Sequence, residues 1–303
     1  MKILEKTHID FMGTRKIWYS ISAAVIIIGI IGAFVRGVSF GIDFLGGTEL
    51  LVRFDNPPAI SEIRDAVQKA GFTSSEIKVF GSPNDILIRT AEQTKGTATL
   101  DAIRQQLTSQ FPSNPYTILK EDKIGPKIGA ELRTNAIYAI FSAMLIIMIY
   151  VGFRFQFIYG VAGVVALFHD VIATFGVIVL LNGLSPYLNL EIDQNIMAAF
   201  LTLVGFSIND TVVIFDRVRE NLKIHKAEDL STIINRSVNE TLSRSIITNG
   251  TVFMVLIVLV IFGGEVNRGF AFTFFIGTIL GTYSTIYVAS ALVLDFTKRQ
   301  AIK

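Results

Sequence analysis

Six long apolar stretches alternate with polar segments along this chain of 303 residues. A helix needs about 20 predominantly apolar residues to cross the hydrocarbon core of a bilayer, where its backbone groups must be paired internally. The pattern therefore predicts six membrane-spanning helices, at 17–35, 136–153, 155–181, 196–215, 245–264 and 269–294. The first stretch is too long for the apolar core of a signal peptide and no small-residue cleavage site follows it, so we expect an uncleaved anchor.

One long polar segment, residues 36–135, separates the first two spans and has the length of a small domain. Its pattern predicts an alternating strand that ends at Phe54, a hairpin and a last strand, with two helices between them. The further elements are a helix at 59–70, strands at 77–80 and 86–89, a helix at 97–111 and a strand at 116–120. The order β-α-β-β-α-β is the ferredoxin-like pattern. We therefore expect an all-α membrane bundle of six spans with a small external α+β domain between spans 1 and 2.

Three parts follow along the chain. Residues 1–35 form a tail and the first span, 36–135 the α+β domain, and 136–303 the other five spans with a polar helical hairpin at 216–244. Lys and Arg gather in the N-terminal tail, at Arg154, in the segment 216–244 and in the C-terminal tail, whereas the loops 182–195 and 265–268 contain only Arg268. Because basic loops stay in the cytoplasm, both termini are predicted to be cytoplasmic and the α+β domain external.

Composition narrows the classes of function. Hydrophobic residues make up 51% and charged residues 17% of the chain, whereas a soluble domain has about 25% charged residues. A net charge of +2 gives no sign of a nucleic-acid partner, and the absence of cysteine excludes disulfides and thiol chemistry. Neither a zinc-binding HExxH pattern nor a Walker A motif is present. With no nucleophile–base set either, the sequence predicts no enzyme, no metal site and no cofactor.

Asp210 is the first candidate for a functional residue inside the membrane. Apolar helix lies on both sides of it, and ionisable groups inside a span are costly and often functional. Burial favours the neutral, protonated form of a carboxyl group, which suits proton uptake and release. Its polar neighbours Ser207, Asn209 and Thr211 could support it by hydrogen bonds. The alternatives are a carboxyl group that only ties two helices together, or a hydrated one near the end of the span.

Two further sites carry charge. Arg244, at the head of the fifth span, either extends toward the interface or points inward to pair with Asp210. Asp170 lies near the middle of the third span beside His169, and consecutive helix positions do not share a face, so the two are not expected to point at one site. A relay role and simple interhelical hydrogen bonding are equally open for Asp170. Gly277-x-x-x-Gly281 predicts close helix packing.

Several segments together resemble the SecD/SecF family of protein-export membrane proteins, in the RND superfamily. The segment Phe40-Gly-Ile-Asp-Phe-Leu-Gly-Gly-Thr48 resembles the family's signature, whose key positions here are Gly41, Asp43, Gly46, Gly47 and Thr48. Further similar segments lie at 125–133, 166–171, 205–221 and 281–285. The external domain is small and the fourth span contains Asn209-Asp-Thr-Val-Val213, which is similar to the SecF type rather than to SecD.

The resemblance implies a role and partners. It assigns ion coupling to Asp210 with Arg244 as its partner, and a function with SecD in moving preproteins at and after the SecYEG channel, driven by the proton motive force. YajC is a further partner that it suggests, the substrate is an unfolded preprotein on the external side, and the location is the bacterial inner membrane. The rival hypotheses are a small-molecule exporter of the RND type and a passive translocon scaffold. The sequence does not separate H⁺ from Na⁺ as the coupling ion.

Overall fold

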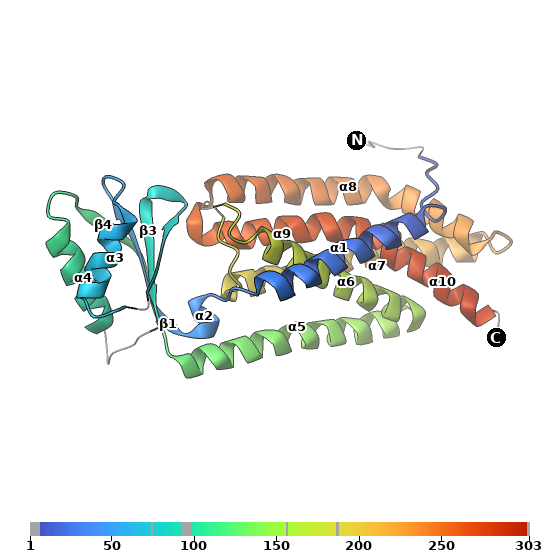
Figure 1. Ribbon diagram of the computed structural model, residues 1–303. Helices are drawn as coiled ribbons and strands as arrows, with labels where there is room; N and C mark the ends of the chain where they lie inside the picture. The colour runs from blue at the N-terminus through green and yellow to red at the C-terminus, as the bar shows by residue number, and fades with distance from the viewer. Residues whose placement is uncertain (1–6, 74, 92–97, 156, 186–187, 302–303) are drawn as a thin grey trace. The chain divides into compact units, whose positions relative to one another are not determined.

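The computed structural model describes residues 7–73, 75–91, 98–155, 157–185 and 188–301 (Figure 1). The chain divides into two compact units. The sheet unit consists of Ser39–Ile137 and Asn182–Gln194, and the bundle unit contains the described residues up to Val38, Tyr138–Leu181 and those from Asn195 onward. The sequence pattern predicts 182–194 as a loop of the bundle, whereas its contacts group it with the sheet. The two tail ends and Thr97, the first residue of a predicted helix, lie outside the described residues.

The described residues of the sheet unit form four strands, in the order β2-β3-β1-β4, and every neighbouring pair is antiparallel. The strands are β1 (Gly47–Phe54), β2 (Ser75–Phe80), β3 (Ser82–Thr90) and β4 (Tyr116–Ile124), and the crossover helices are α3 (Ile60–Lys69) and α4 (Ala98–Gln110). This order confirms the predicted ferredoxin-like α+β domain.

Side chains alternate across the sheet because successive residues of a strand point to opposite faces. On β1, Leu50, Val52 and Phe54 belong to a buried cluster that also includes residues of α3 and α4. Glu49 and Leu51 point to the other face, and Leu51 packs there in a second, smaller apolar cluster. One face of the sheet is therefore a hydrocarbon core, and the other combines apolar and charged side chains.

In the described part of the chain, six helices are long and apolar enough to span a membrane, as predicted. They are α1 (Arg15–Arg36), α5 (Pro126–Arg154), α6 (Phe157–Leu181), α7 (Gln194–Ile224), α8 (Leu230–Phe262) and a last segment. That last segment consists of α9 (Gly264–Ser284), a π-helical stretch (Thr285–Ala289) and α10 (Ser290–Ala301). Helices α7 and α8 extend well beyond the apolar stretches, so most of the predicted polar hairpin at 216–244 belongs to these two helices.

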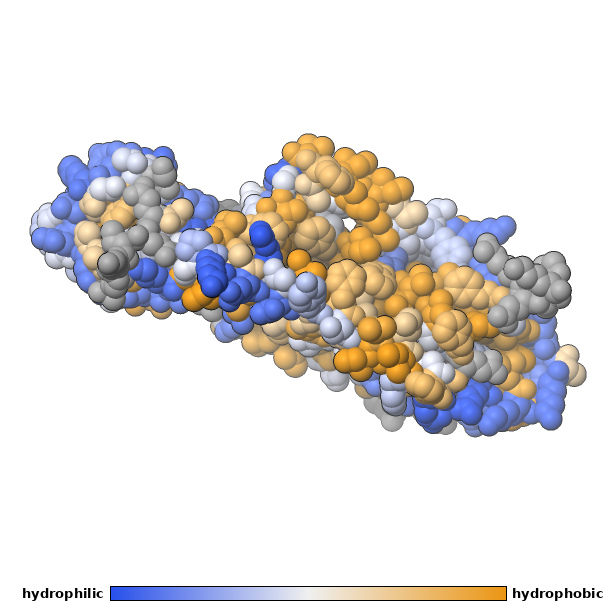
Figure 2. Space-filling view, turned by 90° about the horizontal axis from the view of Figure 1, so that it is seen from below, coloured by the Kyte–Doolittle hydropathy of each residue, from blue (hydrophilic) through white to orange (hydrophobic). Residues whose placement is uncertain are grey.

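Burial separates the spans into two groups. More than half of the apolar window of α6 is buried within the chain, whereas only 11% of the window of α5 is. Large apolar side chains such as Phe141, Leu145 and Ile146 are exposed on α5, and Figure 2 shows apolar residues gathered over the helical part of the molecule. Such surfaces are suited to lipid or to another membrane protein. The chain is a multi-pass membrane protein.

The tail before α1 is held against α8 by two asparagines. The side chain of Asn239 accepts a hydrogen bond from the Ile9 backbone N–H at 3.0 Å and donates one to the Ile9 carbonyl at 2.9 Å. Asn235 accepts from the Met12 backbone N–H at 2.9 Å and donates to the Asp10 carboxylate at 2.7 Å. Met12 is fully buried, so this segment is an integral part of the bundle unit.

Candidate functional site

A chain of polar side chains crosses the interior of the bundle unit around Asp170, which is fully buried on α6. Its Oδ2 accepts a hydrogen bond from Ser207 Oγ on α7 at 2.6 Å, and its Oδ1 lies 2.9 Å from His169 Nδ1. The other ring nitrogen of His169 is 3.0 Å from the Tyr283 hydroxyl, which is 3.2 Å from the Ser22 hydroxyl on α1. Four spans thus contribute to one connected set of hydrogen bonds.

The contact between His169 and Asp170 corrects the prediction that these neighbours point to different sites. The helix-face argument locates Cβ atoms, and consecutive Cβ atoms do diverge. The polar atoms lie two or more bonds further out, so the imidazole and the carboxylate approach each other beside the helix at 2.9 Å.

Glycines on α9 make room for this cluster. A Cβ atom at Gly281 would lie 3.3 Å from Ser207 Oγ and 3.5 Å from Asp170 Oδ2. A Cβ atom at Gly277 would lie 2.6 Å from a Leu203 methyl group. The predicted Gly-x-x-x-Gly motif therefore packs α9 closely against α7 at the level of Asp170.

Asp210, on α7, belongs to a second polar cluster. It is buried, and its Oδ2 accepts a hydrogen bond from Asn249 Nδ2 on α8 at 2.8 Å. The Asn249 Oδ1 atom is buried and has no hydrogen-bond partner among the described residues. Thr211, which was expected to support Asp210, bonds to Thr285 at 3.2 Å, and Asn209 is exposed. The direct partner of Asp210 is therefore the asparagine of the fifth span.

Arg244 is exposed and lines a cavity of about 980 Å³. The cavity lies between the tail before α1 and the adjoining ends of α7 and α8, and its other lining residues include His8, Asp10, Glu240 and Thr248. Within the described part of the chain, no ion pair joins Arg244 to Asp210. Arg244 therefore faces the cavity while Asn249 holds the carboxylate.

The partner of Asp170 and the second carboxylate, Asp210, both lie on α7. Ser207 and Asp210 are three residues apart and are therefore neighbours on the helix surface. The Thr211 hydroxyl also donates to the Ser207 carbonyl at 3.2 Å. Hydroxyl, imidazole and protonated carboxyl groups both donate and accept hydrogen bonds, so the series from Ser22 to Asp170 has the chemistry needed to exchange a proton. The sequence pattern does not indicate Ser22, Tyr283 or Asn249 as site residues, because neutral polar residues in a span do not stand out as charges do.

The glycine-rich motif forms a sharp corner in the sheet unit. A short helix, α2 (Ile42–Leu45), ends at Gly46 and Gly47, whose φ angles of 77° and 142° disfavour other residues. A Cβ atom at Gly46 would lie 2.7 Å from Pro126 Cα, and one at Gly41 would lie 2.9 Å from Asp193 Cβ. Asp43 accepts a hydrogen bond from the Gln194 backbone N–H at 2.9 Å. Thr48 is buried at the start of β1.

Comparison with known proteins places these features in a family context. The family model described as protein export membrane protein SecD/SecF, C-terminal, matches residues 103–299, and the SecD/SecF GG motif matches 31–58. A protein translocase subunit SecF from Rhodothermus marinus is 41% identical over 303 residues, covering 100% of this chain and 98% of that protein. The SecF subunit of Escherichia coli O157:H7 is 38% identical, covering 94% and 87%.

Solved structures agree with the sequence comparison. The crystal structure of SecDF from Thermus thermophilus, described as a translocon-associated membrane protein, matches with a TM-score of 0.84 at 34% identity. The match covers 98% of this chain and 40% of the SecDF chain. A second SecDF structure, in a super-membrane-facing form, matches with a TM-score of 0.71 at 33% identity.

Proposed function

Because this chain belongs to the SecD/SecF family of protein-export membrane proteins, we propose that it couples ion movement through Asp210 to preprotein translocation. The predicted family resemblance is confirmed by the matches over nearly the whole chain. The part of the proposal that goes beyond family membership is the coupling step, and the burial of Asp210 against Asn249 is the observation that supports it.

An amide suits a carboxyl group that changes its protonation state. Asn249 Nδ2 donates to the ionised form of Asp210 at 2.8 Å, and its unpartnered Oδ1 can accept from the protonated form once the amide turns over. A proton that crosses the membrane yields about 2.3 kcal/mol per 100 mV. One or two protons per cycle therefore suffice for a modest movement of a domain.

The Asp170 cluster has a supporting role in this proposal. His169 bridges Asp170 and Tyr283 through its two ring nitrogens, an arrangement in which a proton can move between carboxylate and phenol. A carboxylate next to a serine hydroxyl also offers oxygen ligands for Na⁺. H⁺ is the proposed ion and Na⁺ the alternative.

The proposed assembly follows the relatives. The structural match to SecDF supports a SecD-type partner, since this chain aligns with only 40% of the SecDF chain. We extend this to the SecYEG translocon, to YajC, and to a preprotein that emerges on the external side. The proposed location is the bacterial inner membrane with both termini cytoplasmic, as the distribution of basic residues indicates. The role is transport without a covalent reaction.

Replacing Asp210 with Asn tests the proposal. The variant would be expressed in cells depleted of the native protein. Release of a secreted protein would then be measured with and without an ion gradient. We expect loss of gradient-dependent export at normal membrane level, because Asn cannot take up a proton. Asp216→Asn, the same change at an exposed position of α7, is the matched control. Normal export in the Asp210 variant would favour the passive scaffold, and normal export with lost efflux of a small molecule would favour the exporter.

A further inference from the structure

The segment between α6 and α7 is bound to the sheet unit by backbone pairing. Phe40 and Ile192 form a parallel β-bridge. The Gly41 N–H donates to the Ile192 carbonyl at 3.0 Å, and the Ile192 N–H donates to the Ser39 carbonyl at 2.8 Å. Leu190 and Ile192 are buried. This connection between two spans is therefore a structural element of the sheet unit.

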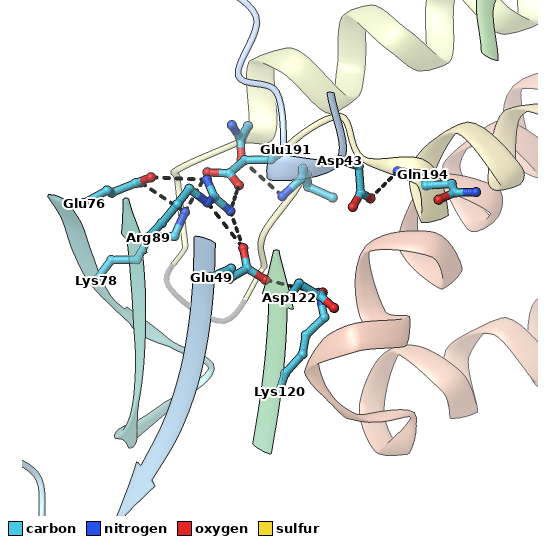
Figure 3. A network of polar contacts seen from close by, with 11 residues as sticks. Asp43, Glu49, Glu76, Lys78, Arg89, Lys120, Asp122, Glu191 and Gln194 are labelled. Carbon is cyan, nitrogen blue, oxygen red and sulfur yellow. Dashed lines mark hydrogen bonds and ion pairs between the residues drawn. The ribbon is translucent and has the colours of Figure 1, made fainter. Parts of the chain in front are cut away.

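Glu191, between these two apolar residues, enters a buried network of ion pairs (Figure 3). It is only 8% exposed. Its carboxylate lies 2.8 Å from Arg89 Nη2 and 2.7 Å from Lys78 Nζ. Arg89 lies 2.8 Å from Glu49 as well. These strand residues extend from the face of the sheet opposite α3 and α4, so the connection covers that face.

The network extends over all four strands. Lys120 on β4 lies 3.1 Å from Glu49 and 2.7 Å from Asp122. Glu76 on β2 lies 3.2 Å from Arg89. Burial alone would lower the pKa of Arg89, but its bonds to Glu191 and Glu49 raise the pKa above its usual value. The connection is thus held by charges that match across the whole sheet.

The same connection leads directly into α7. That helix begins at Gln194, three residues after Glu191, and continues without interruption through Ser207 and Asp210. The Asp43 carboxylate accepts from the first helical N–H, that of Gln194, at 2.9 Å. A carboxylate at this position also interacts favourably with the helix dipole. The start of the helix that contains Asp210 is therefore fixed to the sheet unit at two points.

Charge pairs suit a joint that must keep one geometry. A buried ion pair adds little net stability, but removing one of its two partners is costly. Such a pair can therefore specify the orientation of the segments that it joins. An apolar contact would tolerate sliding. We propose that Glu191 and Asp43 are positioning residues of the transport cycle, which fasten the α6–α7 connection to the sheet so that a displacement of α7 moves the sheet unit. This inference rests on the proposed ion coupling at Asp210.

The test breaks the joint and then restores it covalently. Glu191→Gln combined with Asp43→Ala removes both charges. We expect gradient-dependent export to fall about tenfold, which corresponds to the free energy of one lost hydrogen bond to a charged group. Phe40→Cys with Ile192→Cys is then added. Bridge partners lie at about 5 Å, within the Cα range of a disulfide. The chain contains no cysteine, so oxidation forms this bond alone and should restore export, and reduction should abolish it again.

The outcomes separate this inference from the proposed function. Asp210→Asn is measured in parallel, and Glu62→Ala, an exposed acid on α3, serves as control. If Asp210→Asn loses export while Glu191→Gln with Asp43→Ala keeps it, the joint is not required and the inference is overturned. Failure of the oxidised cysteine pair to restore export overturns it too. So does loss of export when the cysteine pair alone is oxidised, because the connection would then have to detach.

Discussion

The Asp210–Asn249 pair shows how one neutral side chain can serve two charge states of its neighbour. A fixed cation beside a carboxylate would hold it ionised, and a purely apolar pocket would hold it protonated. The amide of Asn249 offers a donor and an acceptor from the same position, and among the described residues only the donor has a partner. Arg244 lines the cavity and, among the described residues, forms no ion pair with Asp210.

Replacing Asn249 with Leu tests this role at the residue scale. The change removes a hydrogen bond to a buried charged group, which contributes about 1.5–3 kcal/mol, so we expect export to fall by about tenfold or more at normal membrane level. Thr251→Leu, at an exposed position of the same helix, is the control. Equal export by the two variants would show that Asp210 does not depend on its amide partner.

Charged residues in spans were predictable from the sequence, and their partners were not. Asp210, Asp170 and Arg244 stand out because an ionisable group in an apolar run is rare. Asn249 and Tyr283 do not stand out, since neutral polar residues are common in spans and their contacts depend on how helices pack. Attention to every polar residue of the fifth span would have found Asn249.

At the scale of helices, α1 packs closely against α6. A Cβ atom at Gly176 would lie 2.7 Å from Gly29 Cα, a backbone atom that cannot yield by rotating a side chain. Small residues on both helices therefore set the distance between them, as in other membrane helix pairs. Trp18, on the same helix α1, stacks on Tyr287 with ring centroids 4.4 Å apart.

Gly176→Ala should therefore destabilise the bundle. Forcing one methyl group into this contact costs about 1–3 kcal/mol by overpacking. Gly205→Ala is the control, because a Cβ atom there meets nothing within 4 Å. Unfolding in detergent would be followed by the fluorescence of Trp18, the single tryptophan of the chain. An unchanged midpoint for the Gly176 variant would mean that α1 and α6 separate without cost.

Elements were predicted well where periodicity is strong. The six spans and four strands were found because lengths of apolar runs and alternation determine them. Helix α2 and the docking of 182–194 were missed. Four residues are too few to show a helical period, and a connection that pairs by backbone bonds and a single buried glutamate has no periodic signature.

At the scale of the whole molecule, two compact units with different chemistry should respond differently to acid. Burial by itself would raise the pKa of Glu191, but Arg89 and Lys78 hold it below its ordinary value of 4.5. Glu49 and Glu76 face the same cations. A carboxylate with a lowered folded pKa stabilises the fold above its unfolded pKa, and that stability is lost as the pH falls through the folded value.

Acidification should therefore loosen the α6–α7 connection before the bundle. Hydrogen exchange of peptides from 188–194 should accelerate as the pH falls below about 4.5, after correction for intrinsic exchange rates. Trp18 fluorescence should stay constant over that interval, and Glu191→Gln should remove most of the pH dependence. Exchange that stays slow and independent of pH in both the unchanged protein and the Glu191→Gln variant would contradict the prediction.

The clasp that Asn235 and Asn239 form around the N-terminal tail has a consequence for biogenesis. Ile9 and Asn239 are 230 residues apart in the chain. A ribosome-bound nascent chain whose first four spans have already been inserted still lacks the partner of its own beginning. The tail can reach its final position only after α8 has been synthesised. Formation of this contact therefore belongs to the last stages of membrane integration.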